Sequence, residues 1–335
     1  MKVEVVRGHI DAPLVESLVT FWTGQGVLKE PAARARAADA VCVLRDDDGR
    51  IVGVNTVYKA RVPSIGERRF WRYRRFVEPE YGDEVHHELL ARAYDALEVE
   101  FESHLAAGGD ADDPMGLCFM LGDRAFAERN PEAVWPASSM MYAGYSPQGR
   151  QVRIRYFRNA ALVGRAIDWD IRPAERVSIE LFARSAVTPD DVVRFWTAEA
   201  RMDPDEARRR VPEVLAVAVD PDGQLAGVCS VYVHEFETLR APVWVCRAFV
   251  RTTNRAMSVG ANLGAAAVTT LEHRFTTGED TRGTGVVMVQ ENAALRAAHP
   301  SAVWRGAPVD LAYVGVTARG HDIRLKWFPG ATVRT

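Results

Sequence analysis

A short run in the C-terminal half of the chain combines residue types that bind anions. Arg255-x-x-Ser258-x-Gly260 follows a segment ending in Phe249-Val250 and precedes a long stretch with helical character. At a helix N-terminus the first backbone N–H groups have no carbonyl partner within the helix, and the helix dipole favours negative charge. Small residues let a phosphate approach the backbone closely. The segment therefore predicts a phosphate-binding turn at the start of a helix.

The equivalent place in the N-terminal half carries the opposite charge. Phe76-Val77 leads there into Glu-Pro-Glu-Tyr-Gly-Asp-Glu, where the basic residue is missing and one residue has been lost. The carboxylates of Asp83, Glu84 and Glu88 would repel a phosphate, and each like-charge contact near the surface costs about 1 kcal/mol or more. We therefore expect the N-terminal half to bind a phosphate poorly or not at all.

The two halves correspond because the chain contains an internal repeat. DGRIVGVNTVY at 48–58 matches DGQLAGVCSVY at 222–232 with six identities in eleven positions, and NPEAVW at 130–135 matches HPSAVW at 299–304. A Phe-Trp-Thr tripeptide and a Phe-Val dipeptide also recur in the same order. Anchors that keep their order while their offset drifts indicate a duplication with small loop deletions.

Each half shows the same order of predicted elements, β-α-α-β-β-β-α-β-α-β-β. Asp11 and Thr188 are N-cap residues that stand just before a helix-starting proline. Turns rich in Asp and Gly join the following strands as hairpins. The long central helices are expected at 84–103 and 258–274. This pattern predicts an α/β fold of mixed type with a mostly antiparallel sheet in each half.

This order of elements resembles that of the GNAT acyltransferase superfamily, and the likeness covers nearly the whole chain, twice. The diagnostic segment of that family is a strand ending in valine, followed by R/Q-x-x-G-x-G/A at the start of the central helix. Arg255-x-x-Ser258-x-Gly260 has this spacing, with serine in place of the middle glycine. The resemblance implies that the turn holds the pyrophosphate of acetyl-CoA or another acyl-CoA. The implied cofactor-binding residues are Phe249, Val250, Arg255, Ala256, Met257, Ser258, Val259, Gly260, Ala261 and Asn292.

The resemblance also implies that a substrate amine attacks the thioester directly, while a base takes its proton and a tyrosine protonates the thiolate. Asn292 stands where the family has an asparagine, but Ala298 lies about where that tyrosine would be. His299 is a candidate acid, because an imidazole titrates near physiological pH. The alternative is that His299 caps the helix before Pro300, as its counterpart Asn130 would in the first half.

Candidates for the base lie near the end of another strand. His234 and Glu237 are the candidates, because strand alternation separates His234 from Glu235, and a solvated strand end is the alternative. Cys246 has the chemistry for an acyl-enzyme, although a small buried residue is more common in such a strand. The arginines and aromatic residues at 69–76 would suit single-stranded nucleic acid, but a core strand with charged edges is favoured.

Composition excludes several classes of function. The formal net charge is −3, so no global basic field favours nucleic acid or an anionic membrane. Four scattered cysteines without C-x-x-C spacing argue against a zinc site and a disulfide framework, and favour a cytoplasmic protein. No apolar run approaches the roughly 18 residues that a membrane span needs. We expect no metal, and neither nucleic acid nor membrane as a partner.

These observations predict GNAT-like domains at 1–162 and 177–335, joined by a linker at 163–176, in a tandem layout that resembles mycothiol synthase-type enzymes. The predicted function is acyl transfer from CoA to an amine of a small molecule or peptide. Two alternatives stay open: another acyl donor, such as an aminoacyl-tRNA or a carrier-protein thioester, and a non-catalytic binding or regulatory role. The chain is expected to be a monomer, with the duplication supplying a pseudo-dimer, or a homodimer.

Overall fold

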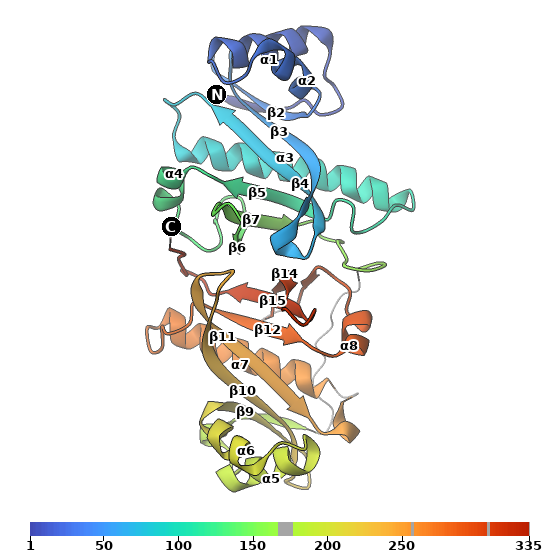
Figure 1. Ribbon diagram of the computed structural model, residues 1–335, viewed down its shortest axis with the longest axis vertical. Coiled ribbons are helices and arrows are strands. Elements are labelled where there is room, and N and C mark those ends of the chain that lie inside the picture. The colour runs from blue at the N-terminus through green and yellow to red at the C-terminus, as the bar shows by residue number, and fades with distance from the viewer. Residues whose placement is uncertain (167–176, 256–257, 307–308, 335) are drawn as a thin grey trace. The chain divides into compact units, whose positions relative to one another are not determined.

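The computed structural model describes residues 1–166, 177–255, 258–306 and 309–334, which form two compact units (Figure 1). The first unit comprises residues 1–166 with Pro300–Ala302. The second unit comprises the described residues of 177–299 and of 303–334. Residues 167–176 of the predicted linker lie outside the described residues.

The first unit has the predicted order of elements. Its long helix covers the predicted range 84–103 and extends a few residues beyond it. In chain order its elements are β1 (Lys2–Val5), α1 (Ala12–Gly24), α2 (Glu30–Ala37), β2 (Ala40–Arg45), β3 (Ile51–Val62), β4 (Arg68–Val77), α3 (Asp83–Ala106), β5 (Gly116–Leu121), α4 (Arg124–Arg129), β6 (Met141–Tyr145) and β7 (Gln151–Tyr156).

The second unit repeats this order with one additional short strand, β13. Its elements are β8 (Ser178–Leu181), α5 (Pro189–Glu199), α6 (Pro204–Arg210), β9 (Val214–Val219), β10 (Leu225–Phe236), β11 (Ala241–Val250), α7 (Val259–Thr276), β12 (Gly285–Gln290), α8 (Ala293–Ala298), β13 (Val303–Trp304), β14 (Leu311–Val316) and β15 (Asp322–Trp327). The mixed α/β class predicted from the sequence is therefore confirmed in both units.

Local sequence explains where the early helices begin. The Asp11 carboxylate accepts a hydrogen bond from the Leu14 N–H at 2.9 Å, so it caps α1. Thr188 and Asp191 form a reciprocal capping box at the start of α5, where Pro189 supplies the fixed φ of a first helical residue. Both caps satisfy backbone donors that the helix itself leaves without partners.

Each unit is built on one mostly antiparallel sheet. The strand orders are β1-β2-β3-β4-β5-β7-β6 and β13-β14-β15-β12-β11-β10-β9-β8. Among the described residues, parallel pairing occurs only between β4 and β5 and between β11 and β12. The registers agree at equivalent positions: Cys42 pairs with Asn55 in the first sheet, and Ala216 pairs with Cys229 in the second.

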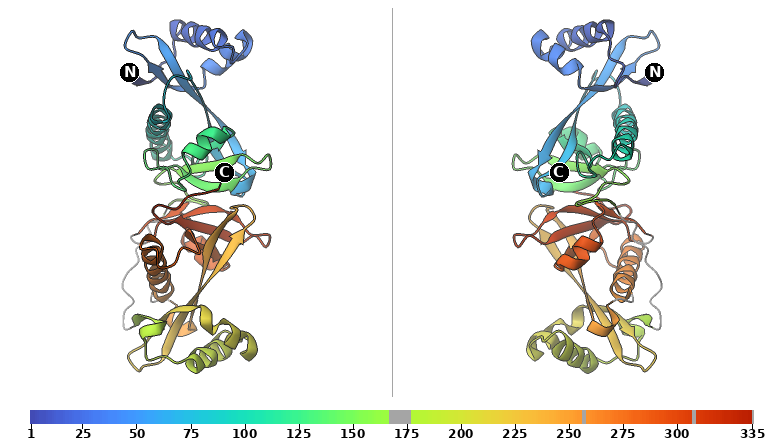
Figure 2. Two further views of the ribbon diagram at one scale, coloured as in Figure 1. Left: turned by 90° about the vertical axis from the view of Figure 1, so that its left-hand side faces the viewer. Right: turned by 90° about the vertical axis from the view of Figure 1, so that its right-hand side faces the viewer.

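The helices cover the two faces of each sheet unequally. In Figure 2 the long helix of each unit lies along one face of its sheet, and the short helix pair lies near one end. Phe21 of α1 packs on Phe76 of β4, with ring centroids 5.6 Å apart, whereas the adjacent Arg75 reaches α3. Because side chains alternate along a strand, α1 and α3 lie on opposite faces. Phe70, in the strand whose arginines and aromatic residues suggested nucleic acid, is fully buried, as expected of a core strand.

Candidate functional site

The start of α7 leaves several backbone donors without helical partners. The first hydrogen bond at this end joins the Asn262 N–H to the Ser258 carbonyl at 3.0 Å. The N–H groups of Val259, Gly260 and Ala261 precede it and have no carbonyl within the helix to which they can donate. The side chain of Ser258 makes no capping hydrogen bond. The helix therefore begins with donors that an anion can accept.

Ser258 has a backbone conformation that favours glycine. Its φ is 56° and its ψ is 12°, in the left-handed region. A non-glycine residue pays about 1–2 kcal/mol for this conformation. Ser258 stands at the position of the middle glycine of the predicted motif, so the turn keeps the shape of that glycine although its side chain has changed.

Gly260 is not required by packing within the chain. A Cβ at this position would meet the Val250 Cγ2 at 3.5 Å, which is an ordinary van der Waals contact. The missing side chain instead leaves the backbone N–H groups of the first turn open to approach. Gly260 therefore lies beside the Val250 side chain, and both were predicted to bind the cofactor.

The two central strands of the second unit part beside this helix start. β11 and β12 pair only over Trp244–Cys246 and Val286–Met288, although β11 continues to Val250. Among the described residues, no strand pairs with the β12 side of Arg247–Val250. Ala248 lies in this stretch and is exposed. Backbone groups and a small side chain thus line the space where the strands diverge.

The short helix α8 leaves its apolar side uncovered. None of its side chains is buried, and Leu295 is 46% exposed. Asn292, predicted to bind the cofactor, is the N-cap of this helix: its Oδ1 accepts hydrogen bonds from the N–H groups of Ala294 and Leu295 at 2.9 and 3.2 Å. The Asn292 side-chain oxygen is therefore engaged in capping, which is a structural role.

The charged residues at the start of α7 are basic. The Arg255 Nε donates to the Val250 carbonyl at 3.2 Å, and the guanidinium remains exposed. Arg251 is already engaged, because its guanidinium pairs with Asp220 at 3.3 Å and with Glu199 at 3.6 Å. Of the two arginines, Arg255 is the one available to a ligand.

The first unit closes the corresponding helix start with its own side chains. Asp83, the first residue of α3, forms two 2.9 Å hydrogen bonds with Arg129 and accepts a third from Asn130. The hydrogen bond from Arg129 is the main reason that the pKa of Asp83 falls to about 2. The Glu84 carboxylate lies over Gly82, where an added Cβ would meet its Oε2 at 2.4 Å. Carboxylates thus occupy the place where an anion would have to bind.

A half-buried arginine fills the region next to this closed helix start. The Arg75 guanidinium lies 4.3 Å from the ring centroid of Phe126 and 4.9 Å from that of Phe119. Its Nε donates to the His86 Nδ1 at 2.7 Å. Burial, followed by the positive charge of Arg75, lowers the pKa of His86 to about 4, so this imidazole is neutral at pH 7.

Equivalent positions of the second unit carry smaller residues. By the offsets of the repeat, Ala248 replaces Arg75, Gly260 replaces His86 and Leu295 replaces Phe126. Neither Ala248 nor Leu295 was predicted from the sequence, because neither residue type suggests chemistry. Their signal lies in the comparison of the two halves, where a large side chain in one unit corresponds to a small or exposed one in the other.

Phe249 does not face the helix start. Its ring packs on Phe195 of α5, with centroids 5.8 Å apart, on the opposite sheet face from α7. Only the backbone of Phe249 lies beside the place where β11 and β12 diverge. Val259 is fully buried in the core beneath α7, so its side chain has a structural role too. Ala256 and Met257, also predicted to bind the cofactor, lie outside the described residues.

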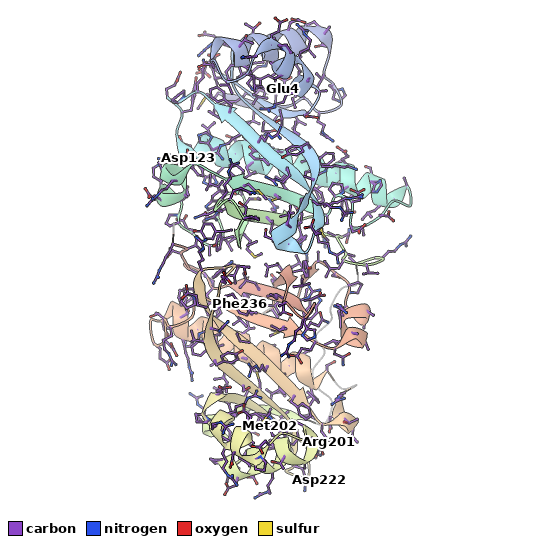
Figure 3. The ribbon with its side chains drawn as sticks, in the orientation of Figure 1. Glu4, Asp123, Arg201, Met202, Asp222 and Phe236 are labelled. Atoms are coloured by element: carbon purple, nitrogen blue, oxygen red, sulfur yellow. The ribbon has the colours of Figure 1, made fainter. Side chains whose placement is uncertain are left out.

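The two predicted bases lie far from the helix start. His234 is on β10 opposite Val243, while Gly227 is opposite Val250, so seven residues of ladder, or about 23 Å, separate His234 from the α7 end of β11. Glu237 follows the strand in an exposed turn, next to Phe236, which Figure 3 labels. The structure therefore does not join this pair to the cofactor turn, and the solvated strand end describes them better.

His299 has the capping geometry that was the alternative to an acid. It is the C-cap of α8 with φ −128° and ψ 66°, and Asn130 ends α4 at −124° and 64°. Its carbonyl accepts from the Trp304 Nε1 at 3.1 Å. Burial and the positive charge of Arg324 lower the pKa of His299, which favours the neutral imidazole at pH 7. A neutral imidazole has no proton to spare for a leaving thiolate, so the predicted acid role is disfavoured.

Cys246 is buried beside the parting of the strands, and its Sγ lies 3.3 Å from that of Cys229. This fits the small buried residue that was the alternative to an acyl-enzyme. In the described part of the chain, no group of three or more His, Cys, Asp or Glu side chains is arranged to hold a metal ion. None of the described helices is both long and apolar enough to cross a membrane.

No protein-family model and no curated protein matches the sequence. Solved structures similar to this chain include GNAT-family acetyltransferases. An acetyltransferase of this family from Streptococcus pneumoniae is 11% identical, covers 45% of this chain and 99% of its own, and has a TM-score of 0.29. Ribosomal-protein-S5-alanine acetyltransferase from Vibrio fischeri is 11% identical, covers 47% and 96%, and has a TM-score of 0.30.

A GNAT family N-acetyltransferase from Escherichia coli, solved in complex with CoA, is 15% identical, covers 48% of this chain and 89% of its own, and has a TM-score of 0.30. At such identities the likeness concerns the fold alone. Each of these proteins corresponds to about half of this chain. The two sheets of this chain have seven and eight strands.

Proposed function

We propose that this chain, which has two GNAT-like units, is an acyl-CoA-dependent N-acyltransferase whose second unit holds the CoA. The observation that carries the proposal is the difference between the two helix starts. Among the described residues, the first N–H groups of α7 have no partner within the helix and its first turn has no carboxylate, whereas Asp83 and Glu84 close the start of α3. The acceptor is proposed to be an amine of a small molecule or a peptide.

The residues of the second unit fit a CoA pyrophosphate. Val259, Gly260 and Ala261 would donate their N–H groups to phosphate oxygens, and the exposed Arg255 guanidinium would balance the negative charge. The small Ala248 and the β12-facing edge of Arg247–Val250, with which no described strand pairs, would accept the pantetheine arm in extended form, since its amides can pair with strand backbone. Bound acyl-CoA would supply an activated thioester carbonyl at this place.

In this proposal His299 accepts the proton of the attacking amine. Its lowered pKa keeps the ring neutral at pH 7, and a neutral imidazole can take a proton. Its counterpart Asn130 contacts Asp83 and His87 near the start of α3, and by the repeat we infer that the end of α8 lies near the start of α7. In this proposal His299 acts as a base, and no described residue is assigned as the acid.

Thermal unfolding with CoA and with acetyl-CoA tests the binding step. A ligand at 100 times its Kd stabilises the protein by about 2.7 kcal/mol. For domains of this size that corresponds to a rise in Tm of several degrees, since each kcal/mol is worth roughly 2–4 °C. We expect such a shift for the wild-type chain and its loss in Gly260→Glu, which adds a carboxylate beside the free N–H groups.

The matched control is Ala198→Glu, which adds the same charge on an exposed position of α5, on the opposite sheet face. We expect this variant to keep the shift. Release of free CoA from acetyl-CoA with a panel of amines then tests the transfer itself. Absence of any shift with CoA or acetyl-CoA in the wild-type chain would contradict the proposal and favour another acyl donor or a non-catalytic role.

A further inference from the structure

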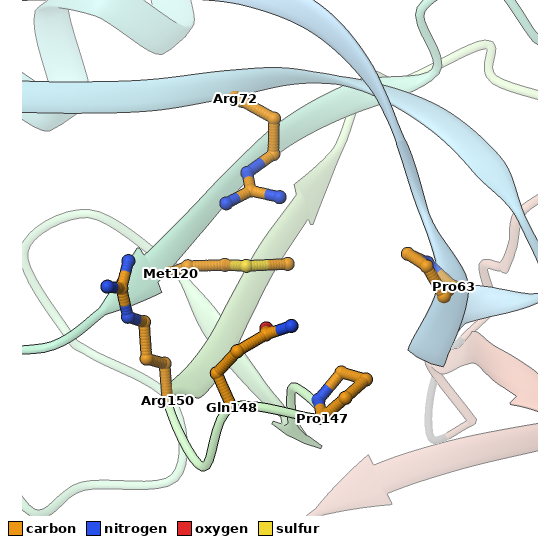
Figure 4. Close-up of a pocket in the computed structure, with 6 residues that line it drawn as sticks. All are labelled: Pro63, Arg72, Met120, Pro147, Gln148 and Arg150. Atoms are coloured by element: carbon orange, nitrogen blue, oxygen red, sulfur yellow. The ribbon is translucent and has the colours of Figure 1, made fainter.

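The first unit has a cavity on the sheet face opposite α3, and this cavity has no role in the proposed acyl transfer. It has a volume of about 440 Å³ and is lined by Pro63, Arg72, Met120, Pro147, Gln148 and Arg150 (Figure 4). Arg72 and Met120 alternate along β4 and β5 with Tyr73 and Phe119, whose rings pack together on the α3 side. The cavity therefore lies on the face opposite α3.

The cavity is positively charged. Two of its six lining residues are arginines and none is acidic. In Figure 4 the guanidinium groups of Arg72 and Arg150 border the space around the Met120 side chain. The Arg72 Nε is buried and has no hydrogen-bond partner among the residues that the structure describes. A buried charged donor without a partner is costly, so an anion that accepts a hydrogen bond from it would be stabilising.

The turn between β6 and β7 holds one wall of the cavity in a fixed shape. The Ser146 N–H donates to the Arg150 carbonyl at 2.8 Å, and the Arg150 N–H donates to the Ser146 Oγ at 3.2 Å. Gly149 closes the turn with φ 73°. Pro147, Gln148 and Arg150 are thus positioned by a hydrogen-bonded turn, so the wall is preorganised for a ligand.

The second unit has the same turn without the arginine pair. Its Thr317 N–H donates to the His321 carbonyl at 2.8 Å, and the His321 N–H donates to the Thr317 Oγ1 at 3.2 Å. At the equivalent positions Arg72 is replaced by Val245 and Arg150 by His321. The turn is common to both units, so the fold does not require two arginines at this place.

We propose that the cavity of the first unit binds a small organic anion, a carboxylate or phosphate ester, with its charged group between Arg72 and Arg150. Guanidinium groups bind the planar or tetrahedral oxygens of such anions through paired hydrogen bonds. The side chains of Met120, Pro63 and Pro147 give the rest of the cavity an apolar lining, so the ligand carries an apolar part. The volume is in the range of small-molecule sites.

Isothermal titration of the full chain with phenyl phosphate and with benzoate tests this proposal, and phenol serves as the neutral probe. We expect saturable binding of at least one anion to one site, and no comparable binding of phenol. Arg72→Met should weaken the anion by about tenfold or more, because a charge-assisted hydrogen bond to a partly buried arginine is lost. The two anions distinguish a phosphate site from a carboxylate site.

Three further variants make the result decisive. Arg150→Gln changes an exposed side chain and should also weaken the anion, and it replaces Arg72→Met if circular dichroism shows that the latter is unfolded. Arg124→Gln, at a side chain that is 80% exposed on α4, should leave binding unchanged. Gly260→Glu should also leave it unchanged, because the α7 site is in the second unit. Lack of saturable anion binding, equal binding of phenol, or loss of binding in Gly260→Glu alone would overturn the proposal.

Discussion

Arg75 and His86 form a 2.7 Å hydrogen bond between β4 and the first turns of α3, in the region that the second unit leaves open. At the equivalent positions the second unit has Ala248, which is exposed, and Gly260, which lacks a side chain. One fold thus contains a filled and an open version of the same region. The filled version is stabilised by contacts of Arg75 with two aromatic rings, and the open version has no such contacts to lose when a ligand binds.

Filling the open version should remove cofactor binding. In Ala248→Trp a large ring would occupy the space beside the parting strands, much as Arg75 does in the first unit, without adding charge. We expect at least a tenfold loss of acetyl-CoA affinity by isothermal titration, with little loss of stability because position 248 is exposed. Ala198→Trp on α5 is the matched control. Undiminished affinity in Ala248→Trp would show that acetyl-CoA does not use this space.

The sequence predicted the fold well because its signals are local and occur twice. Helix caps such as Thr188 and Asp-Gly turns mark element boundaries in both halves, so the order of elements was correct. The site was harder to predict from residue types. His234 and Glu237 have catalytic chemistry, but the strand register separates them from α7. Ala248 contributes by its small size, which has meaning only once Arg75 is known to fill the same place in the first unit.

The stability of the first unit should depend on pH through His86. Its pKa is lowered to about 4, so between pH 6.5 and about 4 the unfolded chain binds a proton at this residue and the folded chain does not. The free energy of unfolding should therefore decrease as pH falls through this window. After allowance for partial exposure we expect about 1–2 kcal/mol.

The His86→Gln variant isolates this effect, because its amide oxygen can still accept from Arg75 but does not titrate. The protection factors of amide hydrogens within α3, measured from pH 7 to 4, should fall more in the wild-type chain than in the variant. Asp83 does not interfere. Its pKa is lowered to about 2, so its contribution to the free energy of unfolding is lost only below about pH 4. Equal pH dependence in the two chains would contradict the assignment to His86.

Replacing Ser258 with glycine should stabilise the second unit. The left-handed φ of 56° is easy for glycine and costs a serine about 1 kcal/mol. Glycine gains more entropy on unfolding, which offsets part of this relief, so we expect a net increase of about 0.5 kcal/mol in the free energy of unfolding by urea denaturation. Ser258→Val should be destabilising, because a β-branched residue tolerates this conformation poorly. A less stable Ser258→Gly variant would argue against the left-handed turn.

Removing the cap of α8 should loosen this helix without unfolding the unit. Asn292 accepts hydrogen bonds from Ala294 and Leu295, and Asn292→Ala leaves both N–H groups without this acceptor, at a cost of about 1 kcal/mol. None of the α8 side chains is buried, so tertiary packing contributes little to offset the loss. We expect faster amide hydrogen exchange confined to residues 293–298, while Asn292→Asp, which retains an acceptor, should stay near the wild-type rate. If acetyl-CoA contacts the Asn292 side chain instead, both variants would weaken its binding with no selective change in exchange, and the capping role would be wrong.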